Sequence, residues 1–316
     1  MQPDSMSFGA TVQDGVRAHQ AQLRARQARV RQGRTQSALP RLANDLTMSG
    51  DQGSIPLQSK KQAQPKPGLK VLDPSSIGVT NAYVRGNLHT PVGADKPDVT
   101  TTDLTIGSDF RVSEDLMIGA AAGGLGNAEA SGATVSAYVT TQPLDKVFVD
   151  MSMSYGAHHS SSKWARSAIG STSDALDGTS RALSISLNTP RQIGEWHWSP
   201  YSRYDRVVTD VAARAASAAA ATASYDLSAM ALGSTAATTW ATPFGPVQPV
   251  VMVEIQREVV TVAGIGTTAS QTQGVVGFGM TTKVSRDMSA FAESRYASDL
   301  AATLDRQMTM GVKFAF

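Results

Sequence analysis

The chain has 316 residues, a formal net charge of +2 and no cysteine, which excludes disulfide frameworks and metal sites built on thiolates. No run of eighteen apolar residues occurs, so a membrane-spanning helix is excluded as well. The charge is divided unevenly: residues 1–79 carry eleven Lys and Arg against five Asp and Glu, whereas residues 80–316 carry seventeen against twenty-one. We therefore treat 1–79 as a basic leader and 80–316 as a separate domain.

The leader is expected to contain one helix. Residues 1–8 have neither the basic start nor the apolar stretch of a secretion signal, so we expect a mature segment, an expressed fragment or a misplaced start. Residues 10–36 are rich in Ala, Gln and Arg, which favours a helix. Arg17, Arg24 and Arg31 are seven residues apart and share one face of that helix.

The basic helix is open to three interpretations. It is a solvated or disordered leader, an arm that neutralises nucleic-acid phosphates, or a plug in a pore, with Arg17, Arg24 and Arg31 as the plug candidates. The nucleic-acid interpretation lacks interleaved aromatic residues, so no nucleic-acid partner is expected. Residues 37–78 are rich in Pro, Gly, Gln and Lys and are expected to form an extended linker, which is the alternative occupant of the pore.

From residue 80 onward, alternating apolar and polar residues predict twelve strands. Val253 and Ile255, for example, alternate with Glu254 and Gln256, so the apolar side chains share one face. The strands are expected near 82–90, 99–112, 115–125, 132–142, 146–157, 178–189, 195–209, 222–240, 247–260, 271–284, 287–297 and 306–316.

The same alternation places charged side chains on the opposite face. If the apolar face meets lipid, the charged face lines a lumen, and its carboxylates complement the basic leader. Asp109, Asp150 and Glu254 are the expected partners of the leader arginines. The side chains predicted to face the lumen are Asp103, Asp109, Arg111, Asp150, Asp205, Glu254, Lys283 and Glu293.

Connection lengths separate a membrane barrel from a soluble sandwich. Tight links such as 113–114 and 143–145 alternate with longer ones such as 158–177 and 210–221. Short periplasmic turns and longer external loops are a property of outer-membrane barrels. The sequence therefore predicts an all-β fold, a twelve-stranded antiparallel transmembrane β-barrel preceded by a basic helix and a Pro-rich linker.

The last strand ends the chain on an aromatic residue, as strands that close bacterial outer-membrane barrels do. We expect this segment to act as an assembly signal and to meet the first strand in the barrel. Its apolar side chains are Met308, Met310, Val312, Phe314 and Phe316.

Several short motifs occur together in residues 80–316. They are Asn-Ala-Tyr-Val-Arg-Gly at 81–86, Ile-Gly-Ser-Asp-Phe-Arg-Val at 106–112, Asp-Leu-Met-Ile-Gly at 115–119, Trp-Ser-Pro-Tyr at 198–201 and Gly-Val-Lys-Phe-Ala-Phe at 311–316. In this order and spacing, over about three-quarters of the chain, they resemble the C-terminal β-barrel, or translocator, domain of type V autotransporters.

The resemblance implies a barrel in the bacterial outer membrane that exports or displays an N-terminal passenger at the cell surface. The implied partners are outer-membrane lipid, the β-barrel assembly machinery, periplasmic chaperones and the chain's own passenger. In that family the pore helix usually runs directly into the first strand, whereas residues 37–78 intervene here. Asn44-Asp45 is only a loose match to the family's self-cleavage at a pore asparagine. A passive pore or an adhesin-like surface protein is the alternative function.

A barrel hydrolase is the third alternative. His158 and Ser160 share a strand face, a spacing similar to the outer-membrane phospholipase A family, but Ser161-Ser162 replaces the Asn-Gly that follows there. Side-chain parity turns both residues toward the lumen, whereas that family's site faces lipid. Ser160 and Lys163 match Ser-x-x-Lys without its companion motifs. We therefore expect no catalytic residue, no cofactor and no metal site.

Overall fold

The computed structural model describes most residues between 12 and 28, all of them helical, and the greater part of the chain from residue 78 onward. The described ranges after the helix are 78–92, 101–113, 115–126, 130–160, 176–213, 222–242, 245–263, 267–285, 288–299 and 304–315. Residues 37–77 of the predicted linker lie outside the described residues, as do Arg31, Asn44-Asp45 and Phe316, whereas Gly78 begins the first strand.

The described residues form fourteen β-strands, of which β7 and β10 are three-residue pieces. The strands are β1 (Gly78–Val92), β2 (Thr101–Arg111), β3 (Leu116–Gly126), β4 (Ala130–Leu144), β5 (Val147–Ser160), β6 (Leu176–Asn188), β7 (Arg191–Ile193), β8 (Trp196–Ala213), β9 (Thr222–Ala237), β10 (Trp240–Thr242), β11 (Gly245–Ala263), β12 (Thr267–Lys283), β13 (Met288–Asp299) and β14 (Leu304–Ala315).

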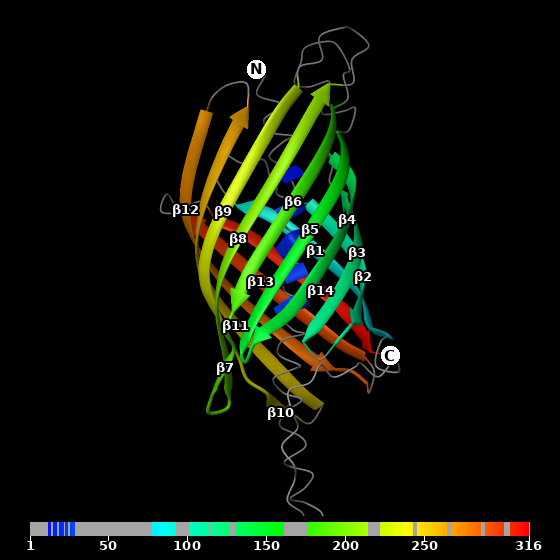
Figure 1. Ribbon diagram of the computed structural model, residues 1–316, viewed down its shortest axis with the longest axis vertical. Helices are drawn as coiled ribbons and strands as arrows, with labels where there is room; N and C mark the ends of the chain where they lie inside the picture. Colours follow the sequence, from blue (N-terminus) through cyan, green and yellow to red (C-terminus); the bar gives the residue numbers. More distant parts are fainter. Residues whose placement is uncertain are drawn as a thin grey trace, which may run out of the picture.

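Twelve of these strands close into one antiparallel barrel, which confirms the predicted fold class (Figure 1). Each barrel strand pairs with the next, and β1 pairs with β14 from Asn81 opposite Ala315 to Val92 opposite Leu304. Closure leaves no sheet edge with unpaired backbone groups, the condition that strands must meet in lipid. β7 and β10 pair with β8 and β11 as hairpins that extend beyond the barrel (Figure 1).

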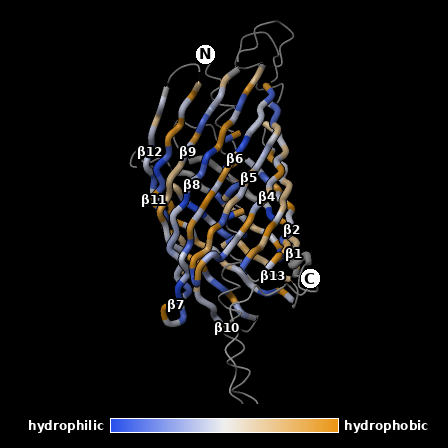
Figure 2. The backbone as a smooth tube through the Cα atoms, viewed as in Figure 1, coloured by the Kyte–Doolittle hydropathy of each residue, from blue (hydrophilic) through white to orange (hydrophobic). Residues whose placement is uncertain are grey.

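Hydropathy alternates along the barrel strands (Figure 2), and this alternation gives the barrel two surfaces of opposite polarity. Outward side chains such as Ile106, Met230 and Ile255 are 56%, 68% and 66% exposed, whereas the inward Asp109 and Glu254 are 0% and 4% exposed. A water-soluble protein shows the reverse arrangement, so the exposed apolar belt is the surface that lipid covers. Within the described part of the chain, no helix is long and apolar enough to cross a membrane.

The strands extend beyond the predicted ranges at one end of the barrel. β11 continues to Ala263 and β12 begins at Thr267, whereas the alternation predicts strands over 247–260 and 271–284. The added residues are mostly Thr, Ala and Ser. Apolar alternation marks only the part of a strand that contacts lipid, so it underestimates strands that continue above the membrane.

The two rims of the barrel are distinguished by the chain ends. β1 begins and β14 ends at the same rim, since Asn81 lies opposite Ala315; we call this the terminal rim. The hairpin turns at 145–146 and 194–195 lie at this rim too. The helical residues lie inside the barrel, along its axis (blue in Figure 1). The lumen and this helix are therefore the place to look for function.

Candidate functional site: the lumen and the helix inside it

The helix repeats its residue types every seven positions. Two turns of an α-helix take about seven residues, so residues seven apart lie on the same face. Each face meets a different part of the barrel wall. The repeating pairs are Val16 with Leu23, Arg17 with Arg24, His19 with Arg26, and Gln20 with Gln27.

The apolar start of the helix lies at the rim opposite the terminal rim. Val12 and Val16 are 0% and 1% exposed. They belong to one buried cluster with residues at strand ends of that rim, including Ala130, Leu176 and Val262. The described helix therefore begins near the rim opposite to the one at which β1 begins.

Lower in the barrel, Leu23 fills a second apolar cluster. It is fully buried against Tyr83, Met117, Ala121 and Tyr138 of β1, β3 and β4. These strands form the wall on one side of the helix. Leu23 thus fixes both the depth of the helix and the wall that it leans against.

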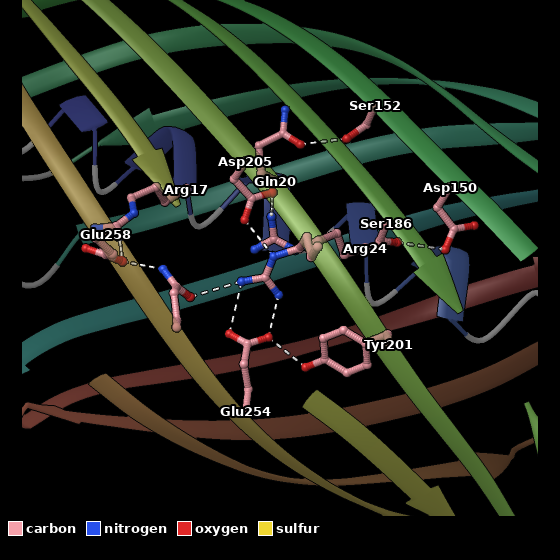
Figure 3. A network of polar contacts seen from close by, with 12 residues as sticks. Arg17, Gln20, Arg24, Asp150, Ser152, Ser186, Tyr201, Asp205, Glu254 and Glu258 are labelled. Carbon is pink, nitrogen blue, oxygen red and sulfur yellow. Dashed lines mark hydrogen bonds and ion pairs between the residues drawn. The ribbon is translucent and has the colours of Figure 1, made fainter. Parts of the chain in front are cut away.

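Polar helix side chains bond to the same part of the wall. The His19 Nδ1 lies 3.1 Å from Thr105 Oγ1, and its Nε2 lies 2.6 Å from Ser136 Oγ. Gln20 donates to Ser154 Oγ at 2.6 Å. It also accepts from Ser152 Oγ at 2.6 Å (Figure 3). Burial of polar groups costs free energy unless they are hydrogen-bonded, and these groups are.

Gln27 ties the lower end of the helix to backbone carbonyls. Its Nε2 donates to the Val139 oxygen at 3.0 Å and to the Met151 oxygen at 3.2 Å. Both carbonyls lie in the halves of β4 and β5 that are nearer the terminal rim. The helix therefore runs from the opposite rim down toward the terminal rim.

Three arginines of the helix form ion pairs with carboxylates of the wall. Arg24 Nη1 lies 2.9 Å from Asp205 Oδ1, and Arg17 pairs with Glu258 (Figure 3). Arg26 pairs with Asp109, and the side chains of these two residues are only 2% and 0% exposed.

The Arg26–Asp109 pair has further support from aromatic residues. The Arg26 guanidinium lies 5.3 Å from the centroid of the Tyr83 ring, a cation–π geometry. The Tyr138 hydroxyl donates to Asp109. A buried ion pair needs further contacts to offset its desolvation: the Tyr138 hydroxyl supplies a hydrogen bond to Asp109, and the Tyr83 ring supplies a cation–π contact to Arg26.

Arg203 organises a second network within the wall itself. It donates to Asp205 Oδ2 at 2.6 Å and binds Glu254 with two nitrogens at 2.5 and 3.0 Å. The Tyr201 hydroxyl donates to the same Glu254 at 2.6 Å (Figure 3). Two-nitrogen contacts between arginine and carboxylate are strong and directional, so the network holds β8 against β11.

The network crosses β9, which lies between β8 and β11. Small inward residues of β9 leave the room for it, namely Ala229, Ala231 and Gly233. A Cβ atom at Gly233 would come within 2.6 Å of the Tyr201 hydroxyl. The glycine is therefore required by the close approach of Tyr201.

The helix selects partly different carboxylates from those expected. Asp109 has an arginine partner from the leader, but Arg24 and Arg17 pair with Asp205 and Glu258. Asp150 accepts hydrogen bonds from Thr140 and Asn188 of the wall. Glu254 is held by Arg203, a residue that the sequence interpretation did not single out. Distance along the barrel axis decides these pairings, and strand parity carries no information on it.

The other residues predicted to face the lumen differ in burial. Asp103 is 7% exposed and accepts a hydrogen bond from Thr105. Glu293 is partly buried, whereas Arg111 and Lys283 are exposed at the ends of β2 and β12. In the last strand, Met308, Met310 and Phe314 are 37%, 52% and 41% exposed, and Val312 is partly buried.

The two candidate hydrolase residues are not paired with each other. His158 is fully buried and its Nε2 lies 2.8 Å from Ser180 Oγ. The Ser160 hydroxyl accepts the Leu176 backbone N–H at 2.7 Å. Among the described residues, no group of three or more His, Asp or Glu side chains is placed to hold a metal ion.

Comparison with known proteins identifies the barrel. The sequence profile of the family described as "Autotransporter beta-domain" matches residues 82–294, which are 213 of the 316 residues. The chain belongs to the autotransporter β-domain family. The resemblance inferred from the short motifs is thereby confirmed.

Solved structures of this family share the fold. The β domain of the Bordetella autotransporter BrkA matches with a TM-score of 0.54 and 13% identity, over 76% of this chain and 100% of that one. The translocator domain of the autotransporter NalP from Neisseria meningitidis matches with a TM-score of 0.50 and 14% identity, over 96% of this chain and 98% of that one. No curated protein matches the sequence.

Family membership gives the barrel its location and orientation. The autotransporter β-domain is an outer-membrane translocator for a passenger domain. Short turns of outer-membrane barrels face the periplasm, and the tight turns at 145–146 and 194–195 lie at the terminal rim. The terminal rim is therefore periplasmic, and Val12 lies at the cell-surface rim.

Proposed function

We propose that the helix between Val12 and Ala28 marks the end of an export event. The passenger that precedes it crosses the lumen, and the helix then stays in the barrel and closes it. The observation that carries this proposal is the direction of the helix. Val12 packs at the cell-surface rim, so a segment preceding the helix leaves the lumen on the outside of the cell.

The contacts in the lumen support a resident helix. An empty twelve-stranded barrel would hold a water channel, and its inward carboxylates would face that water. The helix gives Asp109, Asp205 and Glu258 arginine partners. The charge excess of the leader is thereby matched to acidic side chains of the wall, as expected for a built-in plug.

We also propose that the chain is a transport unit and not a catalyst. A serine nucleophile needs an adjacent base that is itself oriented by a third group. The candidate base His158 contacts Ser180 and not Ser160, and the Ser160 hydroxyl accepts a backbone N–H instead. Release of fatty acid from lipid that disappears in Ser160→Ala or Ser180→Ala would overturn this assignment.

Assembly is proposed to depend on the last strand. Met308, Met310 and Phe314 present an exposed apolar row on β14, next to the seam with β1. We propose that this row, together with Val312 and Phe316, is recognised by the outer-membrane assembly machinery after periplasmic chaperones deliver the chain.

Surface display of an epitope tests the export proposal. An epitope placed ahead of Ala10, behind a functional signal peptide, should be labelled by antibody on intact cells. The matched control carries the same epitope in the tight turn at Asp145-Lys146, on the periplasmic rim, and should be labelled only after the cells are permeabilised. A folded barrel whose N-terminal epitope stays inaccessible on intact cells would favour a passive pore instead.

A further inference from the structure

The helix does not fill the lumen. Two cavities lie beside it, on the side where β11, β12 and β13 form the wall: a lower cavity of about 100 Å³, nearer the terminal rim, and an upper cavity of about 120 Å³. A cavity needs only about 10–15 Å³ on this measure to hold one water molecule. Each cavity therefore has room for several waters.

One face of the helix explains the free space. Arg17, Ala21, Arg24 and Ala28 are four, three and four residues apart, so they share a face. Ala21 and Ala28 line the lower cavity and are too short to reach the wall. The opposite wall carries inward glycines, among them Gly277. The small residues of the helix and of the wall therefore leave the space between them unfilled.

The two cavities adjoin and together follow most of the membrane thickness. Ala21, Arg24, Arg203 and Arg295 line both of them. Along β11 the lining extends from Val250 in the lower cavity to Glu258 in the upper one. Eight residues span about 26 Å along a strand, which is about 20 Å of barrel height at a strand tilt of about 40°, out of an apolar band about 25 Å tall.

The level at which the cavities join is positively charged. Arg24 and Arg203 have carboxylate partners in Asp205 and Glu254. Among the described residues, Arg295 forms no ion pair: its Nη2 lies 3.3 Å from Met252 Sδ, and its buried Nε has no hydrogen-bond partner. The join therefore carries one more positive charge than negative charge.

The acidic groups elsewhere along the lining have hydrogen-bond donors or arginines as partners. In the lower cavity, Asp150 accepts hydrogen bonds from Thr140 and Asn188, and Glu293 interacts electrostatically with Arg85. In the upper cavity, Glu258 pairs with Arg17. At the join, Glu254 also attracts Arg295, but Arg203 binds both of its oxygens, so three arginines share two carboxylates there.

We propose that the plugged barrel keeps a narrow water-filled passage beside the helix, and that Arg295 makes this passage prefer small inorganic anions such as chloride. A fixed charge that lines a narrow pore attracts ions of opposite sign and repels the others. The inference rests on the proposed function, because it needs the helix to be in the lumen.

Planar-bilayer recording of the full chain in a potassium chloride gradient tests this inference. We expect a small, steady conductance with a reversal potential displaced toward the chloride equilibrium potential. Arg295→Gln should move the reversal potential toward or past zero, and Arg295→Lys should keep its sign. Arg206→Gln, on the outer face of β8, is the matched control and should leave it unchanged.

A second variant keeps the test independent of Arg295. Ala21→Leu places a larger side chain at the join and should reduce the small conductance several-fold. A full chain that does not conduct, that prefers potassium, or that ignores both Arg295→Gln and Ala21→Leu would overturn the inference.

Deletion of residues 1–78 separates this outcome from failure of the proposed function. If the deleted and full chains conduct equally, the helix is not in the lumen and both proposals fail. If the deletion conducts much more than a full chain that is silent or cation-selective, the plug stands and only the anion passage fails.

Discussion

Arg26 and Asp109 form the most deeply buried charge pair between the helix and the wall. Removal of one partner from a buried pair leaves an uncompensated charge, which costs about 3–5 kcal/mol. We therefore expect Arg26→Gln to raise the fraction of time that the helix spends outside the lumen. Planar-bilayer recordings should then show frequent large-conductance openings that the unmodified chain lacks.

The partner residue supplies the control for this prediction. Asp109→Asn in the Arg26→Gln background removes the stranded charge, so the large openings should become rarer again. Asp226→Asn is a second control, because it removes one partner of an exposed pair on the outer face. Exposed pairs contribute little to stability, so this variant should not produce large openings. Recordings of Arg26→Gln without large openings would mean that the pair does not hold the helix.

Val253 tests the outer surface at the same scale. It is 52% exposed on the lipid-facing side of β11. An arginine near the middle of the bilayer costs roughly 2–4 kcal/mol, whereas near an interface it costs roughly 0–1 kcal/mol. Val253→Arg should therefore lower the free energy of unfolding in lipid far more than Thr261→Arg, eight residues along the same exposed face. Equal losses in reversible unfolding titrations would contradict the depth assigned to Val253.

At the scale of elements, the strands were predictable because lipid imposes one rule on all of them. Every strand must show apolar side chains outward, and the alternation of Leu104 and Ile106 with Asp103 and Thr105 follows from that rule. The ends of β11 and β12 were predicted short, because the rule no longer applies above the membrane. β7 and β10 were not predicted, because three-residue strands are too short to show an alternation; they continue the hairpins at β8 and β11.

The helix was predictable, and its contacts were only partly so. The seven-residue spacing of Arg17 and Arg24 indicates that they share a face of the helix. The same spacing of His19 and Arg26 indicates a second polar face, which the sequence analysis did not consider. Which carboxylate each arginine meets depends on the depth of the helix in the barrel. That depth is fixed by Leu23 and Val12 in apolar clusters, which a one-dimensional pattern does not reveal.

The last strand carries a prediction of its own. Deletion of Phe316 should strongly reduce insertion into the outer membrane of living cells, because the proposed recognition row loses its terminal aromatic residue. Folding of the purified chain into detergent micelles should be nearly unaffected, since this test bypasses the assembly machinery. Lys313→Gln, in the same strand, is the control. Normal surface levels of the deletion variant would count against the signal, though not against the barrel.

At the scale of the whole molecule, the leader and the barrel are complementary in charge. Residues 1–79 carry a net charge of +6, from eleven Lys and Arg and five Asp and Glu, and residues 80–316 carry −4. Deletion of residues 1–78 exposes Asp109, Asp205 and Glu258 to a wide lumen. We expect a conductance several times that of the full chain and a shift toward cation selectivity, read from single-channel currents and reversal potentials. A large conductance without that shift would mean that the wall carboxylates do not govern the empty pore.

The helix ends toward the same periplasmic rim at which β1 begins, and residues 29–77, 49 in number, join the two. A chain of this length reaches at most roughly 170 Å, so the helix stays at an effective concentration on the order of 0.1 mM or more around its own barrel. Recapture of a displaced helix is consequently a first-order process. The rate of recapture is therefore independent of the protein concentration. Dilution of the protein does not increase the fraction of open barrels.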